Sequence, residues 1–182
     1  MKIKPIHVVI GGVAGYFLFK NMLGLKRFSE KIIISNSVKI NKQKTDISKI
    51  VLDIVVTIKN PTNQKVRIKY PFVQMYMNES LIGTSEPKSE YFNIEANNTT
   101  QFPVSITIST MDFATAIGSK DVINTIKILF KTLSGTATQE EREKISGIAV
   151  NVETLTEVFG VPYTHKDKIP LISNNSKKQE NK

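Results

Sequence analysis

The chain has 182 residues, of which 40% are hydrophobic, enough for one domain with a buried core and short appendages. It contains no cysteine, which excludes a disulfide framework and a cysteine metal site. The net charge of +9 comes almost entirely from lysines spread along the chain. Lysine-rich charge of this kind indicates either a solvated surface or weak attraction to anionic surfaces, and it argues against specific recognition of nucleic acid.

The first segment, residues 1–28, is apolar and has basic flanks. The stretch from Pro5 to Leu25 is interrupted only by His7, Lys20 and Asn21. A bilayer core needs about 20 apolar residues, so this stretch predicts a short membrane-anchoring helix. The expected anchor residues are Ile6, Val8, Val9, Ile10, Val13, Tyr16, Phe17, Leu18 and Phe19, and the expected basic flank is Lys20, Lys26, Arg27 and Lys31.

Other interpretations of this segment stay open. It also fits a signal peptide, although no clear small-x-small cleavage site follows it, or a helix that packs on protein. Its sidedness is open as well. The basic residues that follow favour a cytoplasmic domain by the positive-inside rule, whereas a signal-anchor would place the domain outside.

The next segments alternate between apolar and polar residues, which is typical of β-strands with one buried face. A first strand is expected in residues 29–40. A long second strand, with Ile54 and Val56 facing inward, ends at Asn60-Pro61, because proline has no backbone N–H to pass to a neighbouring strand. Shorter strands are predicted at 66–70, 72–77, 81–84 and 89–94, with a hairpin turn around Asn78 and another turn at 96–98.

A further alternating run at 101–108 predicts another strand, in which Pro103 indicates either a backbone position that faces outward or a position near an edge. The period then changes to three and four residues, which predicts a helical excursion over about 111–145. We expect Ser119 to cap its main helix, and Thr138 and Glu141 to form a capping box for a second one. Strands are expected again at 148–152 and at 158–163, continuing to 171, followed by a disordered basic tail at 173–182.

These elements predict a mainly β protein. The expected fold is an immunoglobulin- or fibronectin-like antiparallel β-sandwich over residues 29–172, with a helical insertion and the N-terminal hydrophobic helix in front of it. Tyr70, Phe72 and Tyr76 either line a binding surface or fill its core.

Clustered reactive groups are missing from the sequence. The only histidines are His7 and His165, the second in an expected late loop, so a zinc site or a histidine-based catalytic site is excluded by counting. No phosphate-binding loop occurs, and the acidic group Glu140, Glu141 and Glu143 fits a solvated helix face. We therefore predict a non-enzymatic protein with no cofactor, no metal and no small-molecule substrate.

Several short motifs resemble one family. They include Asn60-Pro61-Thr62-Asn63 after the long strand, Tyr76-Met77-Asn78, Leu81-Ile82-Gly83 and Ile94-Glu95-Ala96-Asn97-Asn98. With the closing segment Gly160 to Leu171, they resemble the late embryogenesis abundant group 2 domain, also called the water stress and hypersensitive response (WHy) domain. The family-motif residues are Asn60, Pro61, Ile68, Tyr70, Asn78, Gly83 and Ile94.

The resemblance implies a β-sandwich associated with stress and desiccation protection and often tethered to a membrane, with no catalytic residues to transfer. This chain departs from the family pattern at Asn78-Glu79, where Asn-Gly is usual, and in its long helical excursion. Two hypotheses follow. The protein is a membrane-tethered binding or protective protein that meets anionic lipid headgroups, or it is a structural component of a larger assembly, such as a phage virion or cell-envelope complex, with protein partners or further copies of itself.

Overall fold

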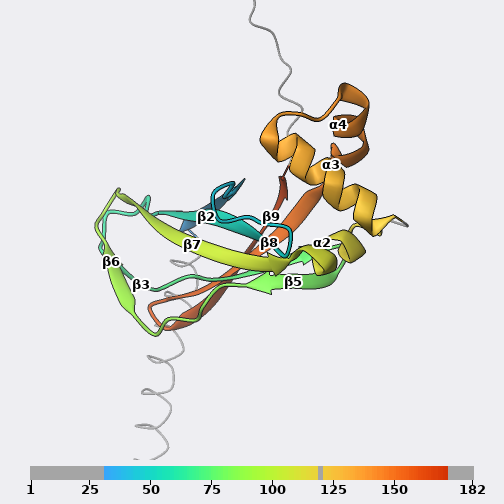
Figure 1. Ribbon diagram of the computed structural model, residues 1–182. Coiled ribbons are helices and arrows are strands. Elements are labelled where there is room, and N and C mark those ends of the chain that lie inside the picture. Colours follow the sequence, from blue (N-terminus) through green and yellow to red (C-terminus); the bar gives the residue numbers. More distant parts are fainter. Residues whose placement is uncertain (1–30, 119–120, 172–182) are drawn as a thin grey trace, which may run out of the picture.

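The structure is a computed structural model that describes residues 31–118 and 121–171. The predicted anchor, the basic flank except Lys31, and the predicted tail lie outside the described residues. Within them the protein is mainly antiparallel β, as predicted, and the predicted helical excursion contains three short helices, of which the first was not expected as a separate helix. The sheets form the two layers of a sandwich, and the helices lie together at one end of it (Figure 1).

One layer is a three-stranded sheet and the other a six-stranded sheet. The first has the order β1-β2-β7, with β1 at Ile33–Ile40, β2 at Lys49–Lys59 and β7 at Thr99–Ser109. In the second sheet, β8 pairs with β9 and also with β4 and β3, which follow one another along it. Strand β5 then pairs with β4, and β6 pairs with β3. The strands of this sheet are β3 (Val66–Lys69), β4 (Phe72–Met77), β5 (Ser80–Thr84), β6 (Tyr91–Ile94), β8 (Ala149–Val158) and β9 (Val161–Pro170).

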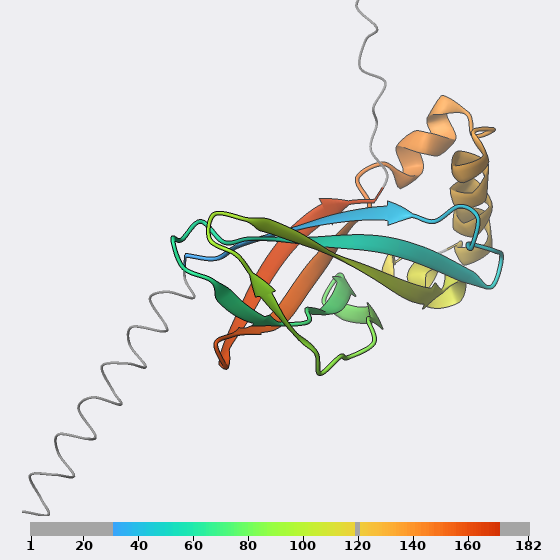
Figure 2. The same cartoon turned by 90° about the vertical axis from the view of Figure 1, so that its left-hand side faces the viewer.

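The core lies between the inner faces of the two sheets. Ile54, Val56 and Ile106 are almost completely buried there, as the alternation predicted. Strand β2 is central in its sheet, and β7 lies at an edge, which confirms the second of the two positions indicated by Pro103. Figure 2 shows the three-stranded sheet lying over the strands of the other layer.

The helices are α2 (Thr110–Ala116), α3 (Val122–Ser134) and α4 (Gln139–Ile145). The capping box of Thr138 and Glu141 at α4 is confirmed. The prediction of Ser119 as the cap of α3 was wrong. The N-cap is Asp121, whose carboxylate accepts a hydrogen bond from the backbone N–H of Asn124 three residues later.

The predicted last strands need a second correction. Residues 158–163 are not one strand, because β8 runs on to Val158, turns at Phe159-Gly160 and returns as β9. Both turn residues have positive φ, 52° and 80°, which is the backbone of a tight type I′ hairpin. As a result His165 lies on β9, paired with Thr154, and not in a loop.

The buried side chain of Asn60 joins the ends of three strands. Its Nδ2 group lies 2.8–3.2 Å from the carbonyl oxygens of Gln64, Ile94 and Glu95, and its Oδ1 accepts hydrogen bonds from the backbone N–H and the hydroxyl of Thr62. The amide thus ties the β2–β3 loop to the end of β6. Two of the three carbonyls also accept a second hydrogen bond, that of Gln64 from the Thr62 hydroxyl and that of Glu95 from the backbone N–H of Asn98.

Each open side of the sandwich has its own closing contacts. On one side, Gly83 of β5 lies so close to β7 that an added Cβ would be 2.5 Å from Cγ2 of Ile106. The Tyr70 hydroxyl donates to the Pro103 carbonyl on the same side, at 2.8 Å. On the other side, Asn36 of β1 donates to the Asp167 carboxylate of β9 from both its backbone N–H and its side chain, at 3.0 and 2.9 Å.

The role of Asn60 gives a first prediction. Asn60→Asp places a carboxylate against three carbonyl oxygens, and we expect it to cost about 3–5 kcal/mol of unfolding free energy at pH 7. Burial raises the folded-state pKa of the new carboxyl above its unfolded value of about 3.9. The loss therefore grows as pH rises through that value, and urea unfolding at pH 4 and pH 7 measures it. The exposed Asn63→Asp is the control, and equal losses in the two variants would contradict this role.

The β4–β5 turn gives a second prediction. Asn78 and Glu79 both have positive φ, 46° and 69°, so a charged residue occupies the position where glycine is usual. Glu79→Gly should relieve this strain and stabilise the fold by about 0.5–1 kcal/mol, measured as a shift of the urea midpoint. The matched control is Glu86→Gly, at an ordinary backbone angle, which should lose a little stability. A loss of stability in Glu79→Gly would refute the turn assignment.

Candidate functional site

The family-motif residues are parts of the scaffold and do not gather into one site. Ile68 and Ile94 are buried on the adjacent strands β3 and β6, and the Ile94 carbonyl accepts a hydrogen bond from the Asn60 amide. Asn78 lies near the helices, where its side chain donates to the Ala116 carbonyl at 2.8 Å, and Gly83 provides the close approach of β5 to β7. The motif therefore specifies strand ends, turns and core contacts, and a binding site must be formed by other residues at the surface.

A polar groove of ≈ 560 Å³ lies on the outer face of the six-stranded sheet. The strand register builds it, because Tyr76 of β4, Asn151 of β8 and Lys168 of β9 lie side by side in one row. A parallel row consists of Gln74, Glu153 and Lys166. Of the predicted aromatic set, Tyr76 thus lines a hollow and is half-buried there.

A second hollow of ≈ 350 Å³ adjoins the groove toward the helices and shares Glu79, Asn151 and Lys168 with it. Its other walls come from Ile117 after α2 and from the loop 146–148 before β8. The two hollows form one depression at the half of the sheet that lies near the helices.

The groove carries charges of both signs. Lys166 forms an ion pair with Glu153 at 3.4 Å. The Lys168 ammonium and the Asn151 amide have no side-chain hydrogen bond or ion pair to any part of the chain that the structure describes. These two groups are free to bind a polar ligand, with the Tyr76 ring as one wall. This site could not be predicted from the sequence, because its residues come together only through the β8–β9 hairpin, which the predicted strands divided wrongly.

The end of the sandwich where the described chain begins carries a charged and aromatic cluster. The Lys69 ammonium donates to Glu157 Oε1 at 2.8 Å, and the Tyr91 hydroxyl donates to Glu157 Oε2 at 2.8 Å. The Lys69 contact, followed by that of Tyr91, holds the pKa of the Glu157 carboxyl below its usual range, and the same bonds raise the pKa of Lys69 and of Tyr91. The stabilisation from Glu157 is therefore present at neutral pH and is lost as pH falls through its lowered pKa.

Aromatic rings stand beside cations at the same end. The Arg67 guanidinium lies 4.4 Å from the ring centre of Tyr91, and the Lys88 ammonium lies 4.4 Å from that of Tyr70. Tyr70 itself packs against Phe92 and Phe102, with ring centres 5.8 and 5.5 Å away. The ring of Tyr70 thus packs on the core while one side of it faces a surface cation, so the residue both fills the core and lines the surface.

The other residues that the sequence singled out form no site within the described ranges. Of the predicted basic flank, Lys31 is described, and it is exposed just before β1. His165 Nε2 lies 3.0 Å from Asp167 Oδ1 on the seam between β1 and β9. Across residues 31–118 and 121–171, no group of three or more acidic or histidine side chains is placed to hold a metal ion. Nor does any helix in these ranges have the length and apolar character required to cross a membrane.

The comparisons with known proteins show only distant likeness. No family model matches the chain, and no curated protein matches it significantly. A solved structure of a candidate late embryogenesis abundant protein is similar over 91% of this chain and 87% of that one, with 11% identity and a TM-score of 0.33. A protein from Archaeoglobus fulgidus is similar over 75% and 94%, with 9% identity and a TM-score of 0.40. A candidate ApaA protein from Bordetella pertussis is similar over 80% and 95%, with 8% identity and a TM-score of 0.43. The resemblance to the group 2 domain therefore stays a sequence-based prediction.

Proposed function

We propose that this protein is a non-enzymatic, membrane-tethered β-sandwich of the immunoglobulin- or fibronectin-like kind that acts by binding through its surface. The apolar segment Ile6–Leu25 holds it to a bilayer, and the basic flank meets anionic headgroups. A protective role under stress or desiccation is part of this proposal, and its support is the resemblance of the motifs to the group 2 domain.

The observation that carries the proposal is the place where the domain joins its N-terminal segment. The first described strand, β1, begins at the end of the sandwich opposite the helices (Figure 2). We call this end the proximal end, and the helical end the distal end. A tether attached at the proximal end leaves the polar groove and the helices directed away from the bilayer, free to meet a ligand or a partner.

Neutralising the basic flank tests the tether. Replacing Lys20, Lys26, Arg27 and Lys31 together by glutamine should weaken binding to acidic vesicles at least tenfold, since each well-placed cation contributes about 1 kcal/mol. Co-flotation with vesicles of anionic lipid measures the binding. The matched control changes the same charge on exposed lysines away from this end, Lys39, Lys42, Lys44 and Lys127. Equal loss in both variants, or no loss in either, would overturn the assignment of the flank.

Attachment and sidedness need a separate measurement. Membrane fractionation of the full chain and of a chain lacking residues 1–25, followed by protease treatment of sealed membranes, reports both. The full chain should sediment with membranes, and the shortened chain should not.

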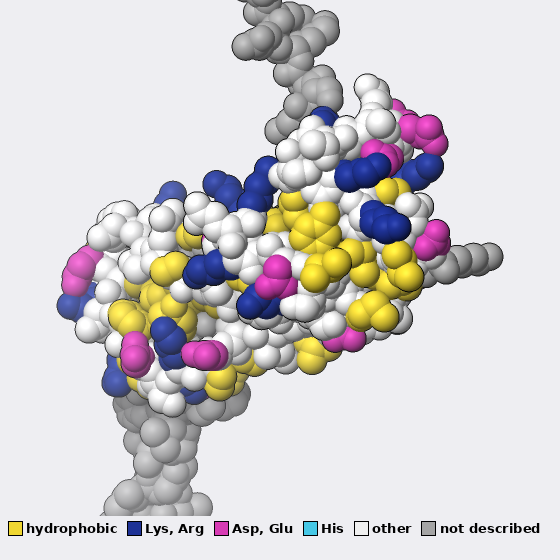
Figure 3. Space-filling view, viewed as in Figure 1, with side chains coloured by type: hydrophobic (Ala, Val, Ile, Leu, Met, Phe, Trp, Pro, Cys, Tyr) yellow, Lys and Arg dark blue, Asp and Glu magenta, His cyan; other side chains and the backbone are white. Residues whose placement is uncertain are grey.

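The distal end favours the second hypothesis, a component of an assembly. Four exposed apolar residues lie around α2. Met111 lies on α2 and Ile123 on α3. Ile47 belongs to a loop that is bonded to the start of α2, where the backbone N–H of Thr110 donates to the Ser48 carbonyl. Leu81 follows the β4–β5 turn, which is bonded to the Ala116 carbonyl at the end of α2. Figure 3 shows hydrophobic side chains gathered over these helices. Exposed apolar patches of this kind mark contacts between proteins.

The assembly hypothesis predicts a species larger than a monomer in buffer without detergent, measured by light scattering after gel filtration. Met111→Glu should then reduce it to a monomer, because the charge would be buried in the contact. Ile33→Glu, at the proximal end, is the control and should leave the assembly intact. A wild-type chain that is monomeric at every concentration would exclude this hypothesis.

A further inference from the structure

The proximal end exposes three apolar residues. The exposed fractions are 52% for Ile33, 41% for Tyr91 and 37% for Phe159. They come from three separate elements, since Ile33 begins β1, Tyr91 begins β6 and Phe159 forms the turn between β8 and β9. Apolar residues from distant parts of the sequence are thus exposed at the same end of the sandwich.

Hydrogen bonds and ring contacts connect the elements that carry these residues. The backbone N–H of Phe159 donates to the Arg67 carbonyl at 3.0 Å, and the Arg67 guanidinium lies over the ring of Tyr91. The Tyr163 hydroxyl, two residues into β9, reaches the carbonyl of Ile32 at 3.5 Å. The start of β1 therefore lies beside the β8–β9 hairpin.

Phe159 occupies an unfavourable backbone conformation. Its φ of 52° is one that asparagine, aspartate and glycine adopt readily in a type I′ turn and that a bulky aromatic residue rarely adopts. The turn at the distal end has asparagine in the equivalent first position, at Asn78. The turn at the proximal end thus carries an aromatic side chain where a small polar residue is usual.

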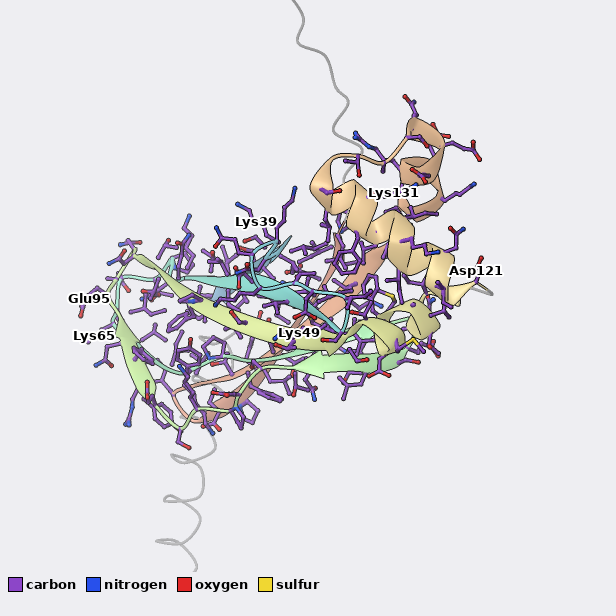
Figure 4. All side chains as sticks on the ribbon, viewed as in Figure 1. Lys39, Lys49, Lys65, Glu95, Asp121 and Lys131 are labelled. Atoms are coloured by element: carbon purple, nitrogen blue, oxygen red, sulfur yellow. The ribbon has the colours of Figure 1, made fainter. Side chains whose placement is uncertain are left out.

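The charges around these residues suit a lipid surface. Lys31, Lys59 and Arg67 are exposed at this end and have no ion pair to a carboxylate of the described chain. Lys65 and Glu95 neutralise one another in an ion pair at 2.6 Å, and they lie side by side in Figure 4. Aromatic rings together with unpaired cations are the composition found at the interface between a bilayer and water.

We propose that the proximal end of the sandwich is itself a contact surface for an anionic bilayer. The rings of Phe159 and Tyr91 and the side chain of Ile33 lie at the level of the headgroups, while Lys31, Lys59 and Arg67 face lipid phosphates. The inference rests on the proposed tether, because the segment that precedes Lys31 brings this end to the membrane. The proximal end then contacts the bilayer directly, and the orientation of the sandwich relative to the membrane is fixed.

The chain contains no tryptophan, which permits a clean test. A single tryptophan is introduced into the full chain as Phe159→Trp, and the protein is reconstituted into acidic vesicles that contain bromine-labelled lipid, a quencher of tryptophan emission. Residues in contact with the headgroup and acyl boundary lie within reach of the quencher. We expect Phe159→Trp to lose about half of its emission relative to unlabelled vesicles. Ile33→Trp serves as a second reporter should the turn reject tryptophan, and Ile47→Trp at the distal end is the control.

Flotation of the same vesicles distinguishes failure of the proposed tether from failure of the proposed contact surface. If the variants float and the proximal reporters are quenched while Ile47→Trp is not, the contact surface is supported. If they float and all three reporters are unquenched or equally quenched, the tether stands and the contact surface is overturned. If none floats, the tether fails and this inference fails with it.

Discussion

The fold depends on one buried amide. Asn60 stands where the long strand β2 ends, and its side chain supplies both the donors and the acceptor that the neighbouring backbone needs. Without it, the β2–β3 loop and the end of β6 would lose three hydrogen bonds to the end of β2, each of which contributes about 0.5–1.5 kcal/mol. The side chain thus holds the β2–β3 loop and the end of β6 to the end of β2, while the backbone ladder pairs β3 with β6.

The layers and the core could be predicted from the sequence, whereas the surface sites could not. Alternation identifies the inner face of β2 and β7 directly, because period two and burial have a common cause. The hairpin at Phe159 was missed, since a phenylalanine in a left-handed turn violates local preference and gives no turn signal before the glycine. The groove was missed for the same reason, because Lys168 and Asn151 are neighbours only if that hairpin exists. Asp121 was missed as a cap because Ser119 offered an equally good capping side chain two residues earlier.

The two ends of the sandwich differ in chemistry. The proximal end combines aromatic rings with cations, whereas the distal end has aliphatic side chains around α2 and a polar groove close by. Both outer sheet faces are mostly polar, and their polar side chains bond largely to one another, as Asp53 does with Asn41 and Ser105 at 2.8 and 3.0 Å. Contacts with other molecules are therefore to be sought at the ends and in the groove.

The seam between β1 and β9 has a consequence for biosynthesis. Asn36 and Asp167 are 131 residues apart in sequence, yet their hydrogen bonds join the first strand to the last. Contacts between such distant segments form slowly, and here they form only after nearly the whole chain has been synthesised. In a nascent chain the edge of β1 would therefore stay uncovered until β9 had left the ribosome, and a chaperone that covers that edge would be of use during this interval.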